Sequence, residues 1–441
     1  MQIGAAWEDI TPDRPLHILG QMHVRTGKRT NDPLTVNAVA FAEGERRVVL
    51  VSCDLCLLPD EDGRAIQAAC AAAHGLPAAA VLIACTHTHV APCTVSYLAG
   101  ERDVRFMADL QQAVVKAVGR ALADLGDATL FAATGWLREM GYNRRGRHAD
   151  GRVDMYHGSW NADFAGVEGP RDGDVPVIFA RRPDGSVKVI ITGFASHPNC
   201  IEGEECYSAD LPGAVRAALR RRLGDDLNVV YLTGSGGNTA PSQLEHNPER
   251  KMPWRGFDGL RRSGEYLALE VQQAMLAASE PMADQSLDWL QAAPRIPIRP
   301  WPAGFPGEIV KYPAARAYYE RCHAAWPQFI AAHSPVEVRV NVVRLGHATI
   351  CSNPGEFYVE HGLAIRQASP AAVTMISQLT DGYCGYIPTV PAFRRGGYST
   401  WPAFTSKLAE DAGDIIVGET RKLLAHAFAG RPLVGVGPRL A

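Results

Sequence analysis

Two histidines, His87 and His89, lie one residue apart in LIACTHTHVAP, directly after an apolar run. In extended backbone, side chains two positions apart point to the same side. One imidazole could then bind a metal while the other lies beside it, and imidazole is a common zinc ligand. An isolated H-x-H pair is more often two partly buried histidines bonded to backbone, so the pair alone leaves both interpretations open.

Polar residues follow other apolar runs in the same way. His197 comes after KVIITGFAS, and Glu356 comes after HATICS, within NPGEF. Two more runs, LNVVYL and TMISQL, end in TGSGGNTAPS and TDGYCGYIPT. In α/β sheets, ligands bind beyond the carboxyl ends of strands, so these five strand exits are expected to converge on one site. Two histidines and a carboxylate at one site favour Zn²⁺, with a coordination position left for water.

Two other motifs each have a structural and a functional interpretation. GSGGN, at residues 234–238, lacks the third glycine of G-x-G-x-x-G and the lysine of a P-loop, which argues against a nucleotide site. It is either a tight turn or a close backbone approach to substrate, with amide groups facing it. GYNRRGRHADGR is either a solvated charged loop or the source of an arginine that grips a substrate carbonyl or carboxylate.

Alternating strand and helix patterns are expected to position these residues. RRVVLVSCDL and AAVLIACT are apolar, and GRAIQAACAAAHG separates them, which predicts a β–α–β unit. Helical spacing recurs in FMADLQQAVVKAVGRALADLG, SADLPGAVRAALRRRLG and FTSKLAEDAGDIIVGETRKLLAHAF. Further strands are predicted at SVKVIITGFAS, LNVVYLTG, VEVRVNVVRLGHATICS and AVTMISQL. This order predicts an α/β fold of mixed β-sheets sandwiched by helices.

A single domain is expected to span residues 1–441, with one irregular excursion. Residues 285–334 are rich in proline and tryptophan, which predicts a lid, an insertion or a linker. The final AGRPLVGVGPRLA is expected to be a surface tail. Cys53 and Cys56 form C-x-x-C within an apolar strand-like run rather than at the start of a helix, so we interpret them as buried free thiols.

The composition excludes several classes of partner. With a net charge of −3 and no polybasic run, the chain has no basic field for nucleic acid or an anionic membrane. No apolar stretch approaches the roughly 18 residues needed to cross a bilayer. MQIGAAWEDITPDRP has neither the basic nor the apolar region of a signal peptide. We therefore expect a cytoplasmic, reduced protein that acts on a small molecule without stable membrane association, either as a monomer or as an oligomer.

Taken together, the motifs resemble the catalytic domain of the neutral/alkaline ceramidase family, and more closely that family's smaller relatives. The resemblance covers nearly the whole chain, through IGAAWEDITPD, NDPLTVNAVAF, VVLVSCDL, THTH, YNRR, FASHP, YSADLPG, NPGEF and GYIPT to GGY. It implies the fold of the family's N-terminal domain and the activity of a zinc-dependent amidase. The zinc ligands that it implies in this chain are His87, His197, Glu356 and Tyr386.

The resemblance also implies catalytic residues. They are His89 beside the metal, Arg144 in the N-R loop and Tyr398 facing the reacting carbonyl. The family's nucleophile segment, G-D-x-S-P-N, reads GNTAPS here, with Ala240 at the serine position and asparagine in place of aspartate. Ser242 lies two residues further on and is expected to point elsewhere. We therefore expect no acyl–serine route. Because we also expect neither a secretion signal nor the family's C-terminal immunoglobulin-like domain, ceramide is expected to be a poor substrate.

The chemistry expected instead depends on the metal. Zinc lowers the pKa of a bound water from about 15.7 to near 7, and the hydroxide can attack an amide, ester or lactone carbonyl. Tyr398, Arg144 and the GSGGN amides would stabilise the oxyanion, and His89 would transfer a proton to the leaving group. Asp54 would either orient a histidine or cap a turn. The alternatives are a metal-dependent hydrolase of glycosides or phosphoesters, a non-catalytic zinc-containing binding protein, and a closed structural zinc site.

Overall fold

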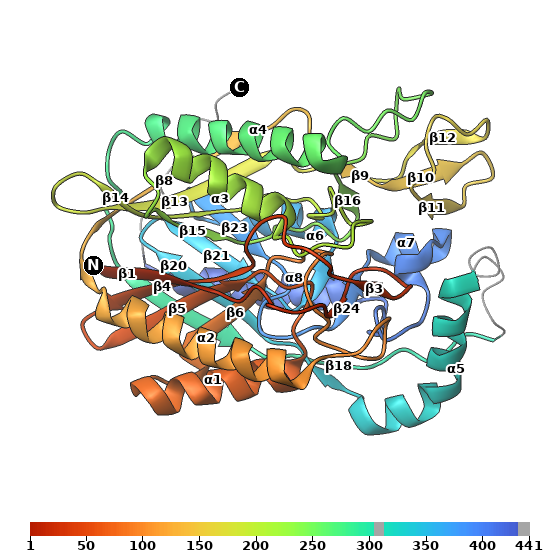
Figure 1. The fold of residues 1–441 in the computed structure, drawn as a ribbon, viewed down its shortest axis with the longest axis horizontal. Coiled ribbons are helices and arrows are strands. Elements are labelled where there is room, and N and C mark those ends of the chain that lie inside the picture. Colours follow the sequence, from red (N-terminus) through yellow and green to blue (C-terminus); the bar gives the residue numbers. More distant parts are fainter. Residues whose placement is uncertain (304–312, 431–441) are drawn as a thin grey trace.

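Three β-sheets form the centre of the molecule in the computed structural model, which describes residues 1–303 and 313–430 (Figure 1). The first sheet has the order β6 (Val81–Cys85), β5 (Arg46–Cys53), β4 (Thr35–Glu43), β1 (Gln2–Asp9), β7 (Gly126–Asp127). The second has the order β15 (Asn228–Tyr231), β14 (Val187–Thr192), β13 (Asp174–Arg181), β8 (Thr129–Trp136). The third has the order β17 (Leu287–Ala292), β20 (Val340–Leu345), β21 (Ala348–Ser352), β23 (Val373–Ser377).

The inner faces of all three sheets share one apolar core. Phe41 and Leu50 of the first sheet, Ile178 of the second, and Val343 and Met375 of the third belong to a single buried cluster. Strands buried on both faces read as near-continuous apolar runs rather than alternating ones. This double burial explains why β4, β5, β6, β20 and β21 are so rich in valine, isoleucine and alanine.

Each sheet is covered on its other face by a pair of helices. The pairs are α1 (Asp60–His74) with α2 (Val104–Ala123), α3 (Asp210–Leu223) with α4 (Gly256–Ala277), and α6 (Val359–Ala368) with α8 (Ala412–Ala427). In Figure 1, the first two pairs lie on opposite sides of the stacked sheets. The apolar faces of α1, α2, α3 and α4 belong to a second buried cluster, and those of α6 and α8 belong to a third. The predicted architecture of mixed sheets sandwiched by helices is therefore confirmed.

A parallel strand pair occurs in every main sheet. These pairs are β5 with β6, β14 with β15, and β21 with β23. A fourth parallel pair joins the short strands β22 (Gly355–Phe357) and β24 (Gly385–Ile387). Because the carboxyl ends of parallel strands meet at one sheet edge, the loops that follow them are brought together. These loops carry the candidate site residues.

The remaining elements are short, apart from the 21-residue helix α5. They are β2 (His17–Ile18), β3 (Arg25–Thr26), η1 (Ala78–Ala80), β9 (Tyr142–Asn143), β10 (Arg145–His148), β11 (Val153–Met155), β12 (Phe164–Val167), β16 (Thr239–Ala240), β18 (Arg295–Ile296), α5 (Pro313–His333), β19 (Val336–Glu337), α7 (Val390–Arg395) and η3 (Tyr398–Thr400). Three of these strands, β10, β11 and β12, form a small separate sheet, named here the flap (Figure 1). Among the helices of the described ranges, none is long and apolar enough to span a bilayer.

Most of the predicted elements are present, with one error of extent. The β–α–β unit is β5, α1 and β6, and its two strands are parallel. The last predicted helix, however, begins at Ala412 rather than near Phe404, because residues 404–411 form turns and bridges around Ser406. All ten cysteines are buried and free, which confirms the interpretation of Cys53 and Cys56.

The proline- and tryptophan-rich segment 285–334 contains β17, β18 and α5. The first of these, β17, is an edge strand of the third main sheet. Helix α5 lies at one end of the molecule, beside α7 (Figure 1). Residues 304–312 of this segment lie outside the described residues, as do residues 431–441 of the predicted tail. A lid function for the segment stays a prediction.

Candidate metal centre

His87 lies in the loop that follows β6, and its backbone holds it in an unusual conformation. Its φ angle is 71°, so the predicted extended backbone of the H-x-H pair is wrong. The ring is buried, and its Nδ1 donates a hydrogen bond to the carbonyl of Cys56 at 2.7 Å. A non-glycine residue at positive φ stores strain that is usually retained at functional sites. The bond at Nδ1 leaves Nε2 with a free lone pair.

His197 reaches the same place from the loop that follows β14. It is fully buried, and its Nδ1 donates to the carbonyl of Gly236 at 2.6 Å. Gly236 belongs to the GSGGN loop that follows the neighbouring strand β15. The parallel pairing of β14 and β15 thus supplies both the ring and the group that orients it. Its Nε2, like that of His87, faces away from the carbonyl and carries the ring's remaining lone pair.

Glu356 comes from β22, directly opposite Tyr386 of β24 in the ladder. Side chains at opposed positions of a ladder point to the same side of the sheet. Tyr383 donates its hydroxyl to Glu356 Oε1 at 2.8 Å and so fixes the carboxylate. The other oxygen, Oε2, is buried without a hydrogen-bond partner among the described residues.

His87 Nε2, His197 Nε2 and Glu356 Oε2 form a nearly equilateral triangle. The two nitrogens are 3.2 Å apart, and the oxygen lies 3.4 Å from His87 and 3.3 Å from His197. A tetrahedral zinc ion with bonds of about 2.0–2.1 Å separates its ligand atoms by about 3.3 Å. The triangle, which we name the His–His–Glu triad, therefore fits one face of a zinc tetrahedron.

The electrostatics of the triad favour a cation. Its three facing atoms all carry lone pairs, and such atoms repel one another in a buried site unless a cation lies between them. Burial alone would lower the pKa of His87, yet Cys56 and Glu356 raise it well above its ordinary value. Burial would likewise raise the pKa of Glu356, but His87 and His197 hold it well below its usual range. The triad thus attracts positive charge, whether a proton or a metal ion.

Arg144 is buried beside the triad, at the start of the flap. Its Nη2 lies 2.9 Å from His197 Nε2, 2.8 Å from the carbonyl of Gly237 and 3.2 Å from the hydroxyl of Tyr386. Because His197 Nε2 has one lone pair, Arg144 and a metal ion compete for it. The carbonyl and the Tyr386 hydroxyl remain available to the guanidinium in either case.

His89 lies on the other side of His87, with its Nε2 3.4 Å from His87 Nε2. Its Nδ1 is 3.3 Å from Glu202, a carboxylate that is also paired with Arg255 and accepts a bond from Asn199 at 3.1 Å. Sequence reasoning missed Glu202, because a single acidic residue in the segment IEGEE has no distinguishing spacing. The carboxylate lies beside the His89 ring, which makes it a candidate to orient the ring.

All seven predicted site residues lie within this region. Every one except His197 lines a cavity of about 420 Å³, and His197 lies directly behind its wall, against Arg144. The rings of Tyr386 and Tyr398 are 5.9 Å apart. The convergence of the strand exits is therefore confirmed. Residues that sequence reasoning missed also line the cavity: Met22, Leu57, Leu98, Met155, Tyr156, Glu202, Tyr319, Tyr383 and Trp401.

In two neighbouring segments, the structure decides between the interpretations that the sequence left open. The amides of Gly234, Gly236 and Gly237 donate to Phe194, Gln378 and Phe357, so they do not face a substrate. The carbonyls of Gly236 and Gly237 instead accept hydrogen bonds from His197 and Arg144, respectively. Among the described residues, Asp54 makes no hydrogen bond or ion pair with a histidine. It accepts from the Thr86 hydroxyl at 3.2 Å, from Thr35 and from Arg216, and so anchors the start of the THTH loop.

The nucleophile segment lies behind the cavity. Ala240 is buried in β16, paired with Tyr142, and does not line the cavity. Ser242 is also buried, and its hydroxyl accepts from Arg255 at 3.3 Å. Among the described residues that line the cavity there is no serine.

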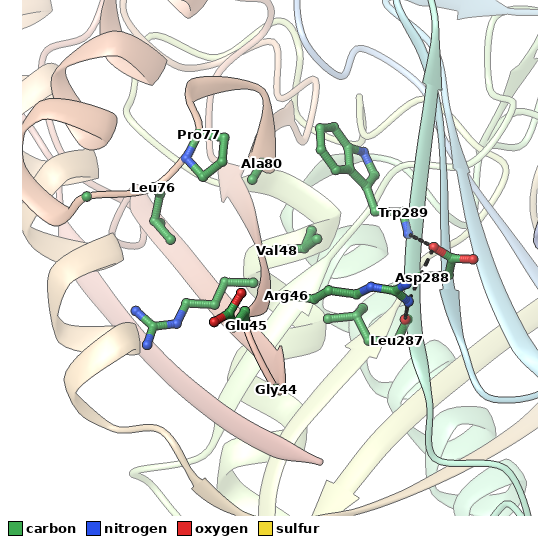
Figure 2. Close-up of a pocket in the computed structure, with 12 residues that line it drawn as sticks. Gly44, Glu45, Arg46, Val48, Leu76, Pro77, Ala80, Leu287, Asp288 and Trp289 are labelled. Atoms are coloured by element: carbon green, nitrogen blue, oxygen red, sulfur yellow. Dashed lines mark hydrogen bonds and ion pairs between the residues drawn. The ribbon is translucent and has the colours of Figure 1, made fainter.

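Two other features were compared with the triad. A hollow of about 530 Å³ between the β4–β5 turn and β17 has no histidine or cysteine among its described lining residues, and its Arg46 is bonded to the Leu287 carbonyl at 3.1 Å (Figure 2). On the flap, His148 and His157 stack at 3.7 Å beside Asp163. Because a metal lies in the plane of an imidazole that binds it, stacked rings are poorly placed to share one ion. The triad is the better metal site.

Comparisons with known proteins bear on the fold. No protein-family model matches the chain, and no curated protein matches it in sequence. The crystal structure of neutral ceramidase from Pseudomonas aeruginosa superposes with a TM-score of 0.76 at 18% identity, over 100% of this chain and 76% of that one. A structure described as ceramidase complexed with C2 gives a TM-score of 0.74 at 17% identity, with 100% and 77% covered. Over its full length, this chain has the fold of the neutral ceramidases.

Proposed function

We propose that the protein is a zinc-dependent hydrolase that cleaves an amide, ester or lactone bond of a small substrate. The observation that carries the proposal is the His–His–Glu triad, whose three buried lone-pair atoms have the spacing of zinc ligands. Both rings are fixed by backbone carbonyls, as ligating histidines usually are. The neutral ceramidase fold supports an amide-bond hydrolase, because the structural neighbours carry that name.

His87, His197 and Glu356 would hold the ion, with the hydroxyl of Tyr386 as the fourth protein ligand. When bound, zinc supplies a water of lowered pKa as the nucleophile. The substrate carbonyl oxygen would accept hydrogen bonds from Arg144 and Tyr398, which face the cavity. Donors of this kind are worth roughly 3 kcal/mol each where negative charge develops in the transition state. His89, held by Glu202, would carry the proton to the leaving group.

No covalent acyl-enzyme is part of this proposal. Covalent catalysis needs a nucleophile beside a base and open to the substrate. Ala240 has no nucleophilic atom, and the Ser242 hydroxyl is buried against Arg255. The reacting water must therefore approach from the cavity side of the triad.

The alternatives are less well supported. A closed structural zinc site would have no cavity, whereas this triad opens onto one of about 420 Å³. Phosphoester hydrolysis by two metals needs a second carboxylate-rich ligand set about 3.5–4 Å away. Two further acidic residues line the cavity, and both have partners: Glu202 is paired with Arg255 and lies beside His89, and Asp154 is paired with His148. An activity measurement distinguishes an enzyme from a non-catalytic binding protein with the same metal site.

Metal content is the first test. Purified protein is expected to hold about one zinc per chain by elemental analysis, and His87→Ala and His197→Ala are expected to lose it. His74→Ala is the matched control, because His74 bonds to the Val115 carbonyl on the far side of the first sheet. Full zinc occupancy in both triad variants would refute the assignment. A screen of amides, esters and lactones against phosphoesters and glycosides then tests the reaction class.

A further inference from the structure

The cavity beside the triad has two chemically different ends. The inner end is polar and is formed by His87, His89, Glu356, Arg144 and Tyr386. The outer end is formed by Met22, Leu98, Ala315, Tyr319 and Trp401, which all belong to one apolar contact cluster. We name this outer end the apolar compartment.

Helix α5 closes the apolar compartment and is fixed in place by hydrogen bonds. The Tyr319 hydroxyl donates to the carbonyl of Tyr398 at 3.4 Å, and the Tyr318 hydroxyl lies 3.2 Å from the Thr405 hydroxyl and amide. Tyr318 and Tyr319 are both 1% exposed, and the Tyr319 ring packs edge-on against Trp401 at 5.5 Å. A wall held at both its ring and its hydroxyl favours a compact apolar group over a long chain.

The volume limits what the compartment can hold. The whole cavity measures about 420 Å³, which at about 30 Å³ per water-sized group corresponds to about 14 non-hydrogen groups. The polar end must take the scissile bond and its neighbours, roughly half of that number. About six to eight carbon-sized groups therefore fit against Leu98, Tyr319 and Trp401.

We infer that the substrate carries one compact apolar group, joined to the scissile bond and seated in the apolar compartment. This inference rests on the proposed function, since it places the reacting carbonyl at the triad. The substrate class is thus an amide, ester or lactone with a short alkyl or aryl group on one side. A polar remainder on the other side would lie toward Gln21 and the exposed His23, which also line the cavity.

Two substrate series test the size limit. One varies the acyl group of N-acylglycines from two to sixteen carbons, and the other varies the amine of N-alkylacetamides over the same range. The compartment receives only one side of the scissile bond, so only one of the two series is expected to respond. In that series, kcat/KM is expected to rise by roughly threefold to fourfold per methylene and to fall beyond about eight carbons. A continuous rise to sixteen carbons, or no dependence in either series, would overturn the inference.

Substitutions at one position should move the limit in both directions. Leu98→Trp fills the compartment, so the ratio of kcat/KM for the six-carbon to the two-carbon substrate is expected to fall at least tenfold. Leu98→Ala removes three carbons, so the optimum is expected to shift by about two carbons toward longer chains. Leu276→Trp, on the solvent side of α4 with 79% exposure, is the matched control and should change neither. Thermal melting establishes that each variant is folded.

A binding measurement separates this inference from the proposed function. Linear carboxylates of two to twelve carbons are titrated into the protein, with the intrinsic tryptophan fluorescence, to which Trp401 contributes, as the readout. Hexanoate is expected to bind more tightly than acetate, and Leu98→Trp should remove the difference. If no amide is hydrolysed but this pattern holds, the reaction is wrong and the compartment stands. If chain length and Leu98→Trp leave binding unchanged, the compartment is wrong.

Discussion

Removing the Tyr383 hydroxyl is expected to weaken zinc binding without removing a ligand. Glu356 offers Oε2 to the triad, while Oε1 accepts from Tyr383 at 2.8 Å. The carbonyl of Tyr383 is itself held by Lys407 Nζ at 3.1 Å, so the hydroxyl has a fixed position. In Tyr383→Phe the carboxylate keeps its charge but loses the bond that sets its orientation.

Two independent considerations give the magnitude. Residues that orient metal ligands typically change metal affinity by about 10- to 100-fold when substituted. This range equals about 1.4–2.8 kcal/mol. A hydrogen bond to a charged group is worth about 1.5–3 kcal/mol, and Glu356 is only 3% exposed, so water cannot easily replace the lost donor. The two ranges overlap, and we expect a Kd increase of at least tenfold.

Competition with a chromogenic chelator at fixed pH measures this Kd. Tyr318→Phe is the matched control, because it removes a buried hydroxyl bonded to Thr405 and makes no bond to Glu356. It should lower the melting temperature while leaving the zinc Kd within about threefold of the wild-type value. The reasoning fails if Tyr383→Phe also stays within threefold, or if both variants weaken zinc binding equally.

Three further outcomes are expected. Ser242→Ala should retain most activity, and a fluorophosphonate should not label the wild type; stoichiometric labelling with loss of activity would contradict the metal route. Glu202→Gln should keep its zinc but lower kcat about tenfold, because His89 loses its charged partner, whereas Glu204→Gln on the exposed edge should change neither. Burial lowers the pKa of Lys407 to about 8, so between pH 8 and 10 this one side chain binds more protons in the unfolded chain than in the folded one. Its contribution to unfolding free energy should therefore rise there, by at most about 3 kcal/mol, and Lys407→Met should abolish that rise in denaturant titrations.

The sequence allowed strands in each main sheet and the helices α1, α2, α3 and α8 to be predicted, because their patterns reflect burial, whereas α4, α5, α6 and α7 and the strands β1, β4, β8 and β13 were not predicted. Strands β5, β6, β14 and β20 lie between two apolar layers, and a continuous run of valine, isoleucine and alanine follows from that position. The start of α8 was predicted too early, since apolar spacing in FTSKLAED is also satisfied by turns that pack against α5. Spacing alone does not distinguish a helical first turn from a packed irregular loop.

The three residues of the His–His–Glu triad could be named from the sequence, but the groups that orient them could not. Histidines and a glutamate after strand exits are visible in the sequence as residue types at particular places. The groups that orient them are mainly backbone carbonyls, of Cys56 and Gly236, and a carbonyl is present at every residue. Glu202 and Tyr383 come from irregular loops, where no periodicity relates sequence position to direction. Only the folded chain brings these groups together.

The GSGGN loop illustrates how backbone, rather than side chains, builds this site. A side chain at Gly237 would place its Cβ 2.4 Å from the carbonyl oxygen of Glu356, which is closer than real atoms approach. The glycine therefore lets the loop after β15 pass directly beside β22. That passage brings the carbonyls of Gly236 and Gly237 within reach of His197 and Arg144, respectively. The glycines thus contribute acceptors that aim a ligand and a cation, and this role does not depend on a serine at position 240.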